Sequence, residues 1–344
     1  METAMEPHEE LEQRWAKFCG IGPGLVVACA SGTAALHLAL ESLRLPSGSK
    51  VVVPSFAQVA CARAVVLSGF EPVFVDCDES LNMDARYFGE AINDLGYSVT
   101  CLMAVHTYGR RCDIERLIVG SLPVGIKLVE DLAEGHGITP SSECDAACWS
   151  FYKNKIVAGA EGGAVAFWQN ADKGLSELRA NFARRLRSLG ASSKNDYSHI
   201  PRGHNYRMSN LHAGPVLTSL ASYKDNLEAR RTIEEAYDLY CPKEWRMPYR
   251  DAPWVYDLRI PNLGNTQQDR IVTQLNKEGI AARHGFKPLH LQEEFRGRVK
   301  FYGPRYNAET QCWRASQEVI YLPLTPGIKL EDCQKAIDLI QAMV

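Results

Sequence analysis

The chain has 344 residues, which is too long for one small core and predicts one large and one smaller domain. Its hydrophobic share of 46% and charged share of 23% are ordinary for a globular enzyme. The net charge of −3 excludes an overall basic surface, so we expect no nucleic-acid partner. Residues 1–15 are acidic and lack the apolar stretch of a signal peptide, and no run of about 18 apolar residues could span a membrane.

The first two thirds of the chain alternates short apolar runs with amphipathic stretches. The runs are rich in valine and mostly apolar throughout, as expected of strands that are covered on both faces. Alternation of strands and helices predicts an α/β fold with a mostly parallel, doubly wound sheet. The expected strands are residues 25–30, 51–54, 72–76, 101–106, 127–131, 146–151 and 162–168, and the expected helices between them are 34–43, 59–67 and 84–92.

The pattern changes in the last third. Residues 223–240 predict a long polar helix that could bridge two domains. Shorter strands at 254–261, 279–286 and 318–324, with helices at 267–278 and 329–343, predict a smaller α+β domain. We therefore divide the chain into a large domain, 1–232, and a small domain, 233–344.

The stretch at 179–187 is rich in arginine. We expect it to be the solvated face of a helix. The alternative is that its arginines line the rim of a phosphate-binding site.

Eleven cysteines are scattered along the chain. The closest pair, Cys144 and Cys148, has no second pair at the spacing of zinc ligands, so we expect neither a metal site nor a disulfide framework. Several cysteines lie in apolar runs, where cysteine behaves as a small buried hydrophobe. Reduced thiols fit a cytoplasmic location.

Four short segments carry groups that can act together. They are SGTAAL (31–36), LVEDLAEGHG with Asp131, SFYKNK with Lys155, and GHNYRMS (203–209). A small-residue turn that opens a helix can bind a phosphate, and an amine at the end of a strand can form a Schiff base. Together with a carboxylate at a strand end, these groups can hold a pyridine aldehyde that carries a phosphate.

The order and the residues of the four segments resemble the DegT/DnrJ/EryC1/StrS family of sugar aminotransferases that depend on pyridoxal 5'-phosphate (PLP). The resemblance runs from about Leu11 to the C-terminus.

The resemblance implies the three-layer fold of type I PLP transferases, with a mostly parallel seven-stranded sheet and a smaller α+β C-terminal domain. Lys155 matches the family's catalytic lysine, the third residue after a Ser-Phe-aromatic triplet, which selects it over Lys153. Relatives that dehydrate their substrate carry histidine there, so lysine favours amino transfer. Asp131 would pair with the pyridine nitrogen of PLP and keep it protonated. The competing carboxylate, Glu130, should face the other side of the strand.

Further cofactor contacts follow from the same resemblance. Glu134 occupies the family position near the ring hydroxyl, while Ser150 and the amides of Gly32 and Thr33 would bind the phosphate at a helix N-terminus. Asn205 would reach the phosphate of the other subunit in a homodimer with shared active sites. Without the resemblance, the segment that contains Asn205 would be read as a loop that enters a helix, with Ser209 as its N-cap.

The chain departs from the family pattern around the pyridine ring. Gln58 stands where an aromatic ring usually stacks on the cofactor, and Phe56 could replace that ring only after a local shift of the chain. The family's first helix is matched by 11–19, so the segment that usually precedes it and frames the substrate mouth is expected to be absent or short.

Three residues are candidates for substrate binding. Arg283 and His290 lie in a segment that resembles the family's R-P-x-F-x-P-L-H run, and Arg207 follows Asn205. Arg283 could hold a carboxylate or phosphate, and His290 could reach the substrate. His284 stands where proline is usual, which indicates an altered pocket.

The sequence therefore predicts a PLP-dependent aminotransferase. Glutamate is the expected amino donor, and a 4-keto or 3-keto deoxysugar linked to a nucleotide is the expected acceptor. One alternative keeps PLP but uses a cyclitol ketone or an aldehyde on a larger molecule. The other is a PLP-binding regulator that has lost catalysis, which the presence of Lys155 and Asp131 disfavours.

Overall fold

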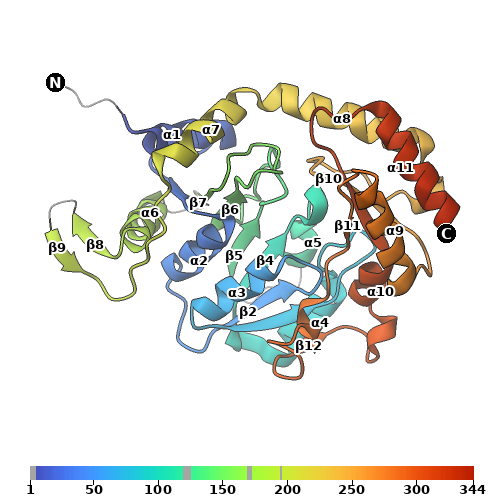
Figure 1. Cartoon of the computed structure of the whole chain (residues 1–344). Coiled ribbons are helices and arrows are strands. Elements are labelled where there is room, and N and C mark those ends of the chain that lie inside the picture. The colour runs from blue at the N-terminus through green and yellow to red at the C-terminus, as the bar shows by residue number, and fades with distance from the viewer. Residues whose placement is uncertain (1–4, 119–124, 169–172, 194–195) are drawn as a thin grey trace.

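The computed structural model describes residues 5–118, 125–168, 173–193 and 196–344. Its main feature is an eight-stranded sheet with the order β1-β7-β6-β5-β4-β2-β3-β12 (Figure 1). All neighbours from β6 to β12 pair in parallel, and β7 runs antiparallel to β1 and β6. The strands are β1 Val26–Cys29, β2 Lys50–Pro54, β3 Glu71–Val75, β4 Val99–Val105, β5 Lys127–Asp131, β6 Ala146–Ser150, β7 Gly163–Phe167 and β12 Phe301–Tyr302.

All seven strands predicted for the first two thirds of the chain are confirmed, and β12 is an eighth strand of this sheet that was not predicted. It has only two residues and comes from the C-terminal part of the chain, where it pairs in parallel with β3. The amide of Phe74 donates to the carbonyl of Lys300 (2.9 Å), and the amide of Asp76 donates to the carbonyl of Tyr302 (2.9 Å). This segment is a strand because it pairs with the edge of β3, and its own residue pattern gives no strand signal.

Helices cover both faces of the sheet and complete the predicted three layers. Strand residues that point to one face, such as Val27 and Cys29, pack against α2, α3 and α6. Their neighbours Val26 and Ala28 point the other way and pack against α1 and α7, while α4 and α5 cover the rest of that face. The helices are α1 Pro7–Cys19, α2 Gly32–Ser42, α3 Val59–Leu67, α4 Ala85–Leu95, α5 Ile114–Ile118, α6 Lys173–Arg187 and α7 Asn210–Ala221.

Helix α2 begins two residues earlier than predicted. Ser31 is its N-cap, and the Ser31 hydroxyl accepts a hydrogen bond from the amide of Ala34 (3.1 Å). A serine cap satisfies one of the unpaired amides at a helix start. Gly32 and Thr33 therefore form the first helical turn rather than the turn before the helix.

The last third forms a separate apolar core. Ile233 and Tyr237 on α8 pack against a three-stranded antiparallel sheet of order β10-β13-β11 and its helices. These elements are α8 Tyr223–Tyr240, β10 Val255–Arg259, α9 Asn265–Lys277, β11 Arg283–His284, α10 Gln311–Glu318, β13 Val319–Pro323 and α11 Leu330–Met343. Short 3₁₀ helices are η1 Gly96–Ser98, η2 Thr107–Gly109, η3 Lys243–Trp245, η4 Leu289–Leu291 and η5 Asn307–Glu309. The domain division at residue 232 stays a prediction.

A β-hairpin that was not predicted lies between α6 and Asn205. Its strands are β8 Ala191–Ser193 and β9 Asp196–His199. Figure 1 shows the hairpin projecting from the body of the molecule beyond α6. Within the described residues, no helix is both long enough and apolar enough to cross a bilayer.

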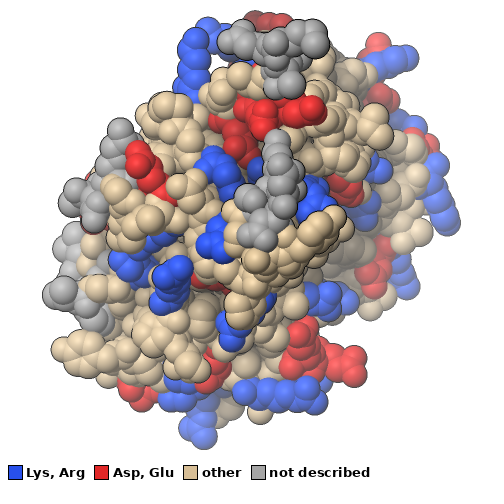
Figure 2. All heavy atoms as spheres, turned by 90° about the vertical axis from the view of Figure 1, so that its left-hand side faces the viewer, with Lys and Arg blue, Asp and Glu red and all other residues tan. Residues whose placement is uncertain are grey.

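Two of the four arginines of α6 are buried in ion pairs, rather than on the expected solvated face or phosphate rim. Arg179 and Arg187 are buried. Arg179 pairs with Asp145 (2.9 Å), and Arg187 pairs with Glu12 on α1 (2.6 Å). Figure 2 looks onto this side of the molecule, where Lys and Arg side chains are interspersed with acidic and uncharged ones. These ion pairs attach α6 to the start of β6 and to α1.

Candidate active site

A cavity of about 430 Å³ opens at the carboxyl ends of β4, β5 and β6. This is the edge at which doubly wound sheets bind their ligands. Helix α2 approaches it with its N-terminus, and α3 and residues from the C-terminal core close other sides. The wall consists of Ser31, Gly32, Thr33, Leu36, Gln58, Val59, Ala60, Arg63, Val105, Asp131, Ala133, Glu134, Ser150, Tyr152, Asn154, Lys155, Glu161, Trp254, Phe286 and Tyr321.

Lys155 extends into this cavity from the turn after β6. Its Nζ atom lies 4.0 Å from Oε1 of Glu134 and 3.7 Å from the centre of the Trp254 ring. Burial lowers the pKa of the Lys155 amine, although the negative charges of Glu134 and Asp131 act in the opposite direction. A lowered pKa increases the unprotonated, nucleophilic fraction of the amine. The rival Lys153 is exposed and does not line the cavity.

Two carboxylates share the cavity wall with this amine. Asp131, at the end of β5, accepts hydrogen bonds from the amide of Ala133 (2.9 Å) and the thiol of Cys61 (3.1 Å). Glu134 accepts from the amide of Tyr108 (2.8 Å). Burial raises the pKa of Glu134 to about 7, against the lowering effect of Lys155.

Glu130 lies on the other face of β5, as the alternation of strand residues requires. Its carboxylate contacts Nε2 of His106 (2.9 Å) and accepts from the amide of Ser141 (2.8 Å). Glu130 is absent from the cavity wall that the described residues form. Of the two adjacent acids, only Asp131 is available to a ligand in the cavity.

The start of α2 and the end of β6 meet so closely that only glycine fits at position 32. A Cβ atom on Gly32 would lie 2.8 Å from Cβ and 3.3 Å from Oγ of Ser150. The amides of Gly32 and Thr33 belong to the first helical turn, whose N–H groups have no partner within the helix. Free amides, the helix dipole and the Ser150 hydroxyl form a small cradle for an anion.

Arg230 on α8 fixes the loop that carries the lysine, and sequence reasoning missed it. The guanidinium is buried and donates to the carbonyls of Asn154 (3.2 Å), Lys155 (3.1 Å) and Trp254 (2.8 Å). Trp254 also donates from Nε1 to the Asn154 carbonyl (3.2 Å). Trp254, Phe286 and Tyr321 add the aromatic part of the wall. They come from distant segments, so no local pattern marks them.

Gln58 lines the cavity, and Phe56 does not replace it. Phe56 is fully buried, with its ring 5.6 Å from Phe286 and 6.0 Å from Tyr108. The aromatic surface of the cavity instead includes Trp254 beside the lysine. An aromatic ring is thus present in the wall, but it comes from a different part of the chain than Gln58.

Four other candidates lie outside the cavity wall of this single chain. Asn205, Arg207 and Arg283 are exposed, and Arg283 is near enough to Tyr321 to affect its pKa. His290 is buried, with Nδ1 at 2.7 Å from the Ser55 hydroxyl and its ring stacked on Phe301. Substrate binding by Arg207, Arg283 and His290 therefore stays a prediction from the resemblance.

The comparisons with known proteins agree with this geometry. The model of the DegT/DnrJ/EryC1/StrS aminotransferase family matches residues 3–341. The chain belongs to this family. A GDP-perosamine synthase of Caulobacter vibrioides is 30% identical over 300 residues, which cover 83% of this chain and 78% of that one. A UDP-N-acetyl-3-dehydro-alpha-D-glucosamine 3-aminotransferase of Acidithiobacillus ferrooxidans is 28% identical over 349 residues, with 96% and 87% covered.

A solved structure of a DegT/DnrJ/EryC1/StrS aminotransferase from Brucella abortus superposes with a TM-score of 0.83 at 26% identity. The match covers 98% of this chain and 90% of that chain. The predicted fold, family and class of enzyme are thereby confirmed. This chain is a PLP-dependent aminotransferase.

The cavity of this aminotransferase fits the cofactor. The Gly32–Ser150 cradle suits the phosphate, because glycine at position 32 lets the amides at the start of α2 lie close to the Ser150 hydroxyl. Asp131 suits the pyridine nitrogen, and the Lys155 amine suits the aldehyde. These groups line one continuous cavity. The polar groups of the cavity thus match the phosphate, the ring nitrogen and the aldehyde of PLP.

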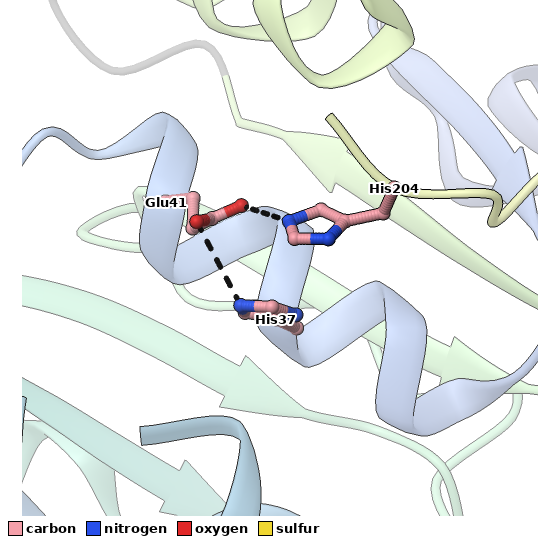
Figure 3. Close-up of side chains that lie close together, drawn as sticks. All are labelled: His37, Glu41 and His204. Carbon is pink, nitrogen blue, oxygen red and sulfur yellow. Dashed lines mark hydrogen bonds and ion pairs between the residues drawn. The ribbon is translucent and has the colours of Figure 1, made fainter. Parts of the chain in front are cut away.

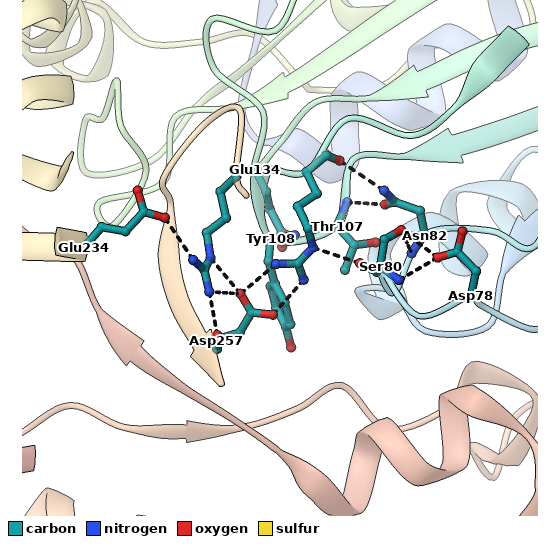
Figure 4. Close-up of polar contacts among 10 residues, drawn as sticks. Asp78, Ser80, Asn82, Thr107, Tyr108, Glu134, Glu234 and Asp257 are labelled. Atoms are coloured by element: carbon teal, nitrogen blue, oxygen red, sulfur yellow. Dashed lines mark hydrogen bonds and ion pairs between the residues drawn. The ribbon is translucent and has the colours of Figure 1, made fainter. Parts of the chain in front are cut away.

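An ionic network joins the cavity of the aminotransferase to the C-terminal core (Figure 4). Arg110 makes a two-pronged pair with Asp257 on β10 (2.9 and 2.6 Å), and Arg250 donates to the same carboxylate (2.8 Å) and to Glu234 (2.9 Å). Asp257 is fully buried. Burial alone would raise the pKa of Asp257, but Arg110 and Arg250 lower it below its usual value.

The network supports a strained segment beside the cavity. Tyr108 adopts a left-handed φ of 53°, which is unfavourable for a bulky residue. The next residue, Gly109, approaches the C-terminal part so closely that a Cβ would lie 1.7 Å from the carbonyl oxygen of Ala252. The Tyr108 amide is the donor that holds Glu134. Contacts around Arg110 therefore determine the position of one wall of the active site.

Proposed function

We propose that this aminotransferase transfers an amino group from glutamate to a keto carbon of a deoxysugar linked to a nucleotide, at position 3 or 4 of the sugar. The observation that carries the proposal is a cavity in which Lys155, Asp131 and the Gly32–Ser150 cradle face the same space. Two relatives that span most of the chain are named for acting on GDP-linked or UDP-linked sugars. This support favours a sugar nucleotide over a cyclitol or a larger aldehyde.

Each group in the cavity has a distinct task in the proposed reaction. PLP, when bound, carries the amino group and accepts the electron pair released when the donor's Cα–H bond breaks. Nζ of Lys155 takes that proton and later returns one, which its lowered pKa permits. The Asp131 carboxylate keeps the ring nitrogen protonated, and the amides of Gly32 and Thr33 with the Ser150 hydroxyl hold the phosphate. Because burial raises the pKa of Glu134, its neutral form is available to donate a hydrogen bond near the ring hydroxyl.

The proposal is tested by separating the two halves of the reaction. The PLP-loaded protein is mixed with glutamate alone, and we expect the absorbance of the bound cofactor to change to that of its amine form. Addition of a GDP-linked or UDP-linked keto sugar should then restore the original absorbance, whereas the free keto sugar without its nucleotide should not. If a cyclitol ketone restores the original absorbance and none of the nucleotide-linked keto sugars does, the proposed acceptor is wrong. If another amino acid, but not glutamate, converts the cofactor to its amine form, only the proposed donor is wrong.

The active sites are proposed to lie between two chains. Asn205 is exposed and outside the cavity of its own chain, although the resemblance assigns it to a cofactor phosphate. The segment that contains it follows the projecting β8–β9 hairpin, which could contact a second subunit (Figure 1). A two-fold dimer would place each Asn205 at its partner's Gly32–Ser150 cradle.

Mixing two inactive variants should restore activity if the sites are shared. Chains with Lys155→Ala and chains with Asn205→Asp are exchanged in equal amounts, and turnover is measured. One site of each heterodimer then has both residues intact, so about a quarter of all sites should be active. Lys155→Ala mixed with Asp131→Asn is the control, because these two residues share one chain's cavity and no site can be repaired. No rescue in the first mixture, despite proven subunit exchange, would remove Asn205 from the site.

We also propose that the protein works in a reducing compartment such as the cytoplasm. All eleven cysteines are free, and ten of them are buried. Burial raises the pKa of several of these thiols well above its usual value, as for Cys61 and Cys148, which keeps them protonated and unreactive.

A further inference from the structure

Three side chains that could bind a metal ion converge outside the PLP cavity (Figure 3). His37 and Glu41 are four residues apart on α2, so they lie on the same face of the helix. His204 comes from the segment after β9. Its Nε2 atom is 2.7 Å from Oε2 of Glu41, and Nε2 of His37 is 3.8 Å from Oε1 of Glu41. The three candidate ligand atoms all lie within 4.8 Å of one another.

A buried nitrogen that lacks a hydrogen bond is a second sign of a ligand. The His37 side chain is only 3% exposed. Its Nε2 atom makes no hydrogen bond of ordinary geometry with any residue that the structure describes. Its Nδ1 atom is 3.2 Å from the hydroxyl of Tyr206. Histidines that bind metal through one nitrogen usually donate a hydrogen bond from the other, which fixes the ring. Tyr206 supplies that acceptor, so Nε2 is oriented toward Glu41.

His204 is also held in place before any ion binds. Its amide donates to the carbonyl of Leu186 (2.6 Å), and its carbonyl accepts from the amide of Leu189 (2.9 Å). Its ring stacks on Tyr206, with centroids 4.8 Å apart and planes inclined by 18°. The backbone and the ring stack thus present His204 to α2, and little conformational freedom remains to be lost on binding.

We propose that His37, Glu41 and His204 bind a divalent transition-metal ion of the zinc type. Two histidines and one carboxylate are an established ligand set for zinc, with a fourth position left for water. Zn–N bonds of about 2.0–2.1 Å place tetrahedral ligand atoms about 3.3 Å apart, so small rotations of the Glu41 carboxylate and the two rings suffice. The ion replaces the direct contact between Glu41 and His204.

Of the three proposed ligands Glu41, but neither histidine, lines a nearby cavity. Glu41 belongs to the wall of a cavity of about 330 Å³ that lies away from the PLP cavity. Arg44 and Arg202 line the same cavity, so water or an anion is expected at the fourth position. The competing explanation is a metal-free ion pair between His204 and Glu41, in which His37 is only a packed neighbour. That explanation requires no affinity for zinc.

The ion would connect two segments of the chain that each carry a predicted cofactor contact. Helix α2 starts at the cradle formed by Gly32, and Asn205 directly follows His204. A metal bond between the helix and this segment would hold them together. Ion binding should therefore stabilise the fold whether or not the proposed amino transfer occurs.

The test uses the full chain with PLP bound, after metals are removed with a chelator. Zn²⁺ alone is titrated calorimetrically, and Co²⁺ alone is followed by its visible absorption, which reports tetrahedral coordination. We expect one equivalent per chain and a higher unfolding temperature with Zn²⁺. His204→Gln and Glu41→Gln should each weaken Zn²⁺ binding by more than 100-fold. Tyr206→Phe, which keeps the ring but loses the acceptor, should weaken it by about 10-fold or more.

The matched control is His199→Gln, because His199 is an exposed histidine in the nearby hairpin. It should leave Zn²⁺ affinity unchanged. A substitution of the buried His37 could disturb the fold, so the decision rests on His204→Gln. The side chain of His204 is 22% exposed. Circular dichroism and PLP absorbance check that the variant protein is folded. Absence of saturable Zn²⁺ binding, or equal binding in the wild type and all variants, would overturn the proposal in favour of the metal-free ion pair.

Discussion

Lys155→Ala should abolish amino transfer while the protein still binds the cofactor weakly. Proton transfer by a positioned group contributes about 10²–10⁴-fold to a rate. The variant would also lose the proposed covalent link to the cofactor, so we expect turnover to fall by at least the upper end of that range. Binding should persist in part, because Gly32, Thr33 and Ser150 are unchanged. Turnover with glutamate and dialysis of the cofactor measure the two effects.

Chemical labelling identifies the lysine directly. Borohydride treatment of the wild type should fix the cofactor irreversibly to the peptide that contains Lys155. Lys153→Ala is the matched control, since Lys153 is exposed two residues away and should tolerate the change with normal activity and labelling. A label on Lys153, or an active Lys155→Ala protein, would refute the assignment.

Much of the large sheet could be predicted because its strands are covered on both faces. Each of the seven predicted strands is a short apolar run between helical patterns, and burial on two faces leaves a strong signal. Helices α3 and α8 also have the predicted bounds. Strand β12 could not be predicted, because the edge of β3 rather than its own composition makes it a strand.

Some residues of the candidate site could likewise be predicted from the sequence, and others could not. Lys155, Asp131 and Ser150 end their strands or follow them closely, so a local motif identifies them and the sheet brings them together. Trp254 and Arg230 act on the lysine loop from the C-terminal part of the chain, and only the tertiary fold reveals them. The His37–Glu41–His204 cluster was missed because 163 residues separate Glu41 from His204. Spacing along the chain finds metal ligands only when they are close in sequence.

Asp257→Asn should cause the largest loss of stability outside the catalytic groups. The carboxylate is fully buried and neutralises both Arg110 and Arg250, whose side chains are each 3% exposed. Removing one partner of a buried ion pair leaves uncompensated charge and costs about 3–5 kcal/mol. Urea denaturation at pH 7 and fixed protein concentration should show this decrease. Asp338→Asn, which changes an exposed carboxylate on α11, should shift the free energy of unfolding by less than about 0.5 kcal/mol.

The pH dependence of that difference follows from the lowered pKa of Asp257. A carboxyl group whose pKa is lower in the folded state stabilises the fold at any pH above its unfolded pKa of about 3.9. The stabilisation decreases as the pH falls toward the folded pKa, where Asp257 becomes protonated and resembles asparagine. The wild type and Asp257→Asn should therefore differ by a constant amount above about pH 5 and converge in acid. A difference that does not depend on pH would show that packing rather than charge holds Arg110, and with it the strained segment at Tyr108 that positions Glu134.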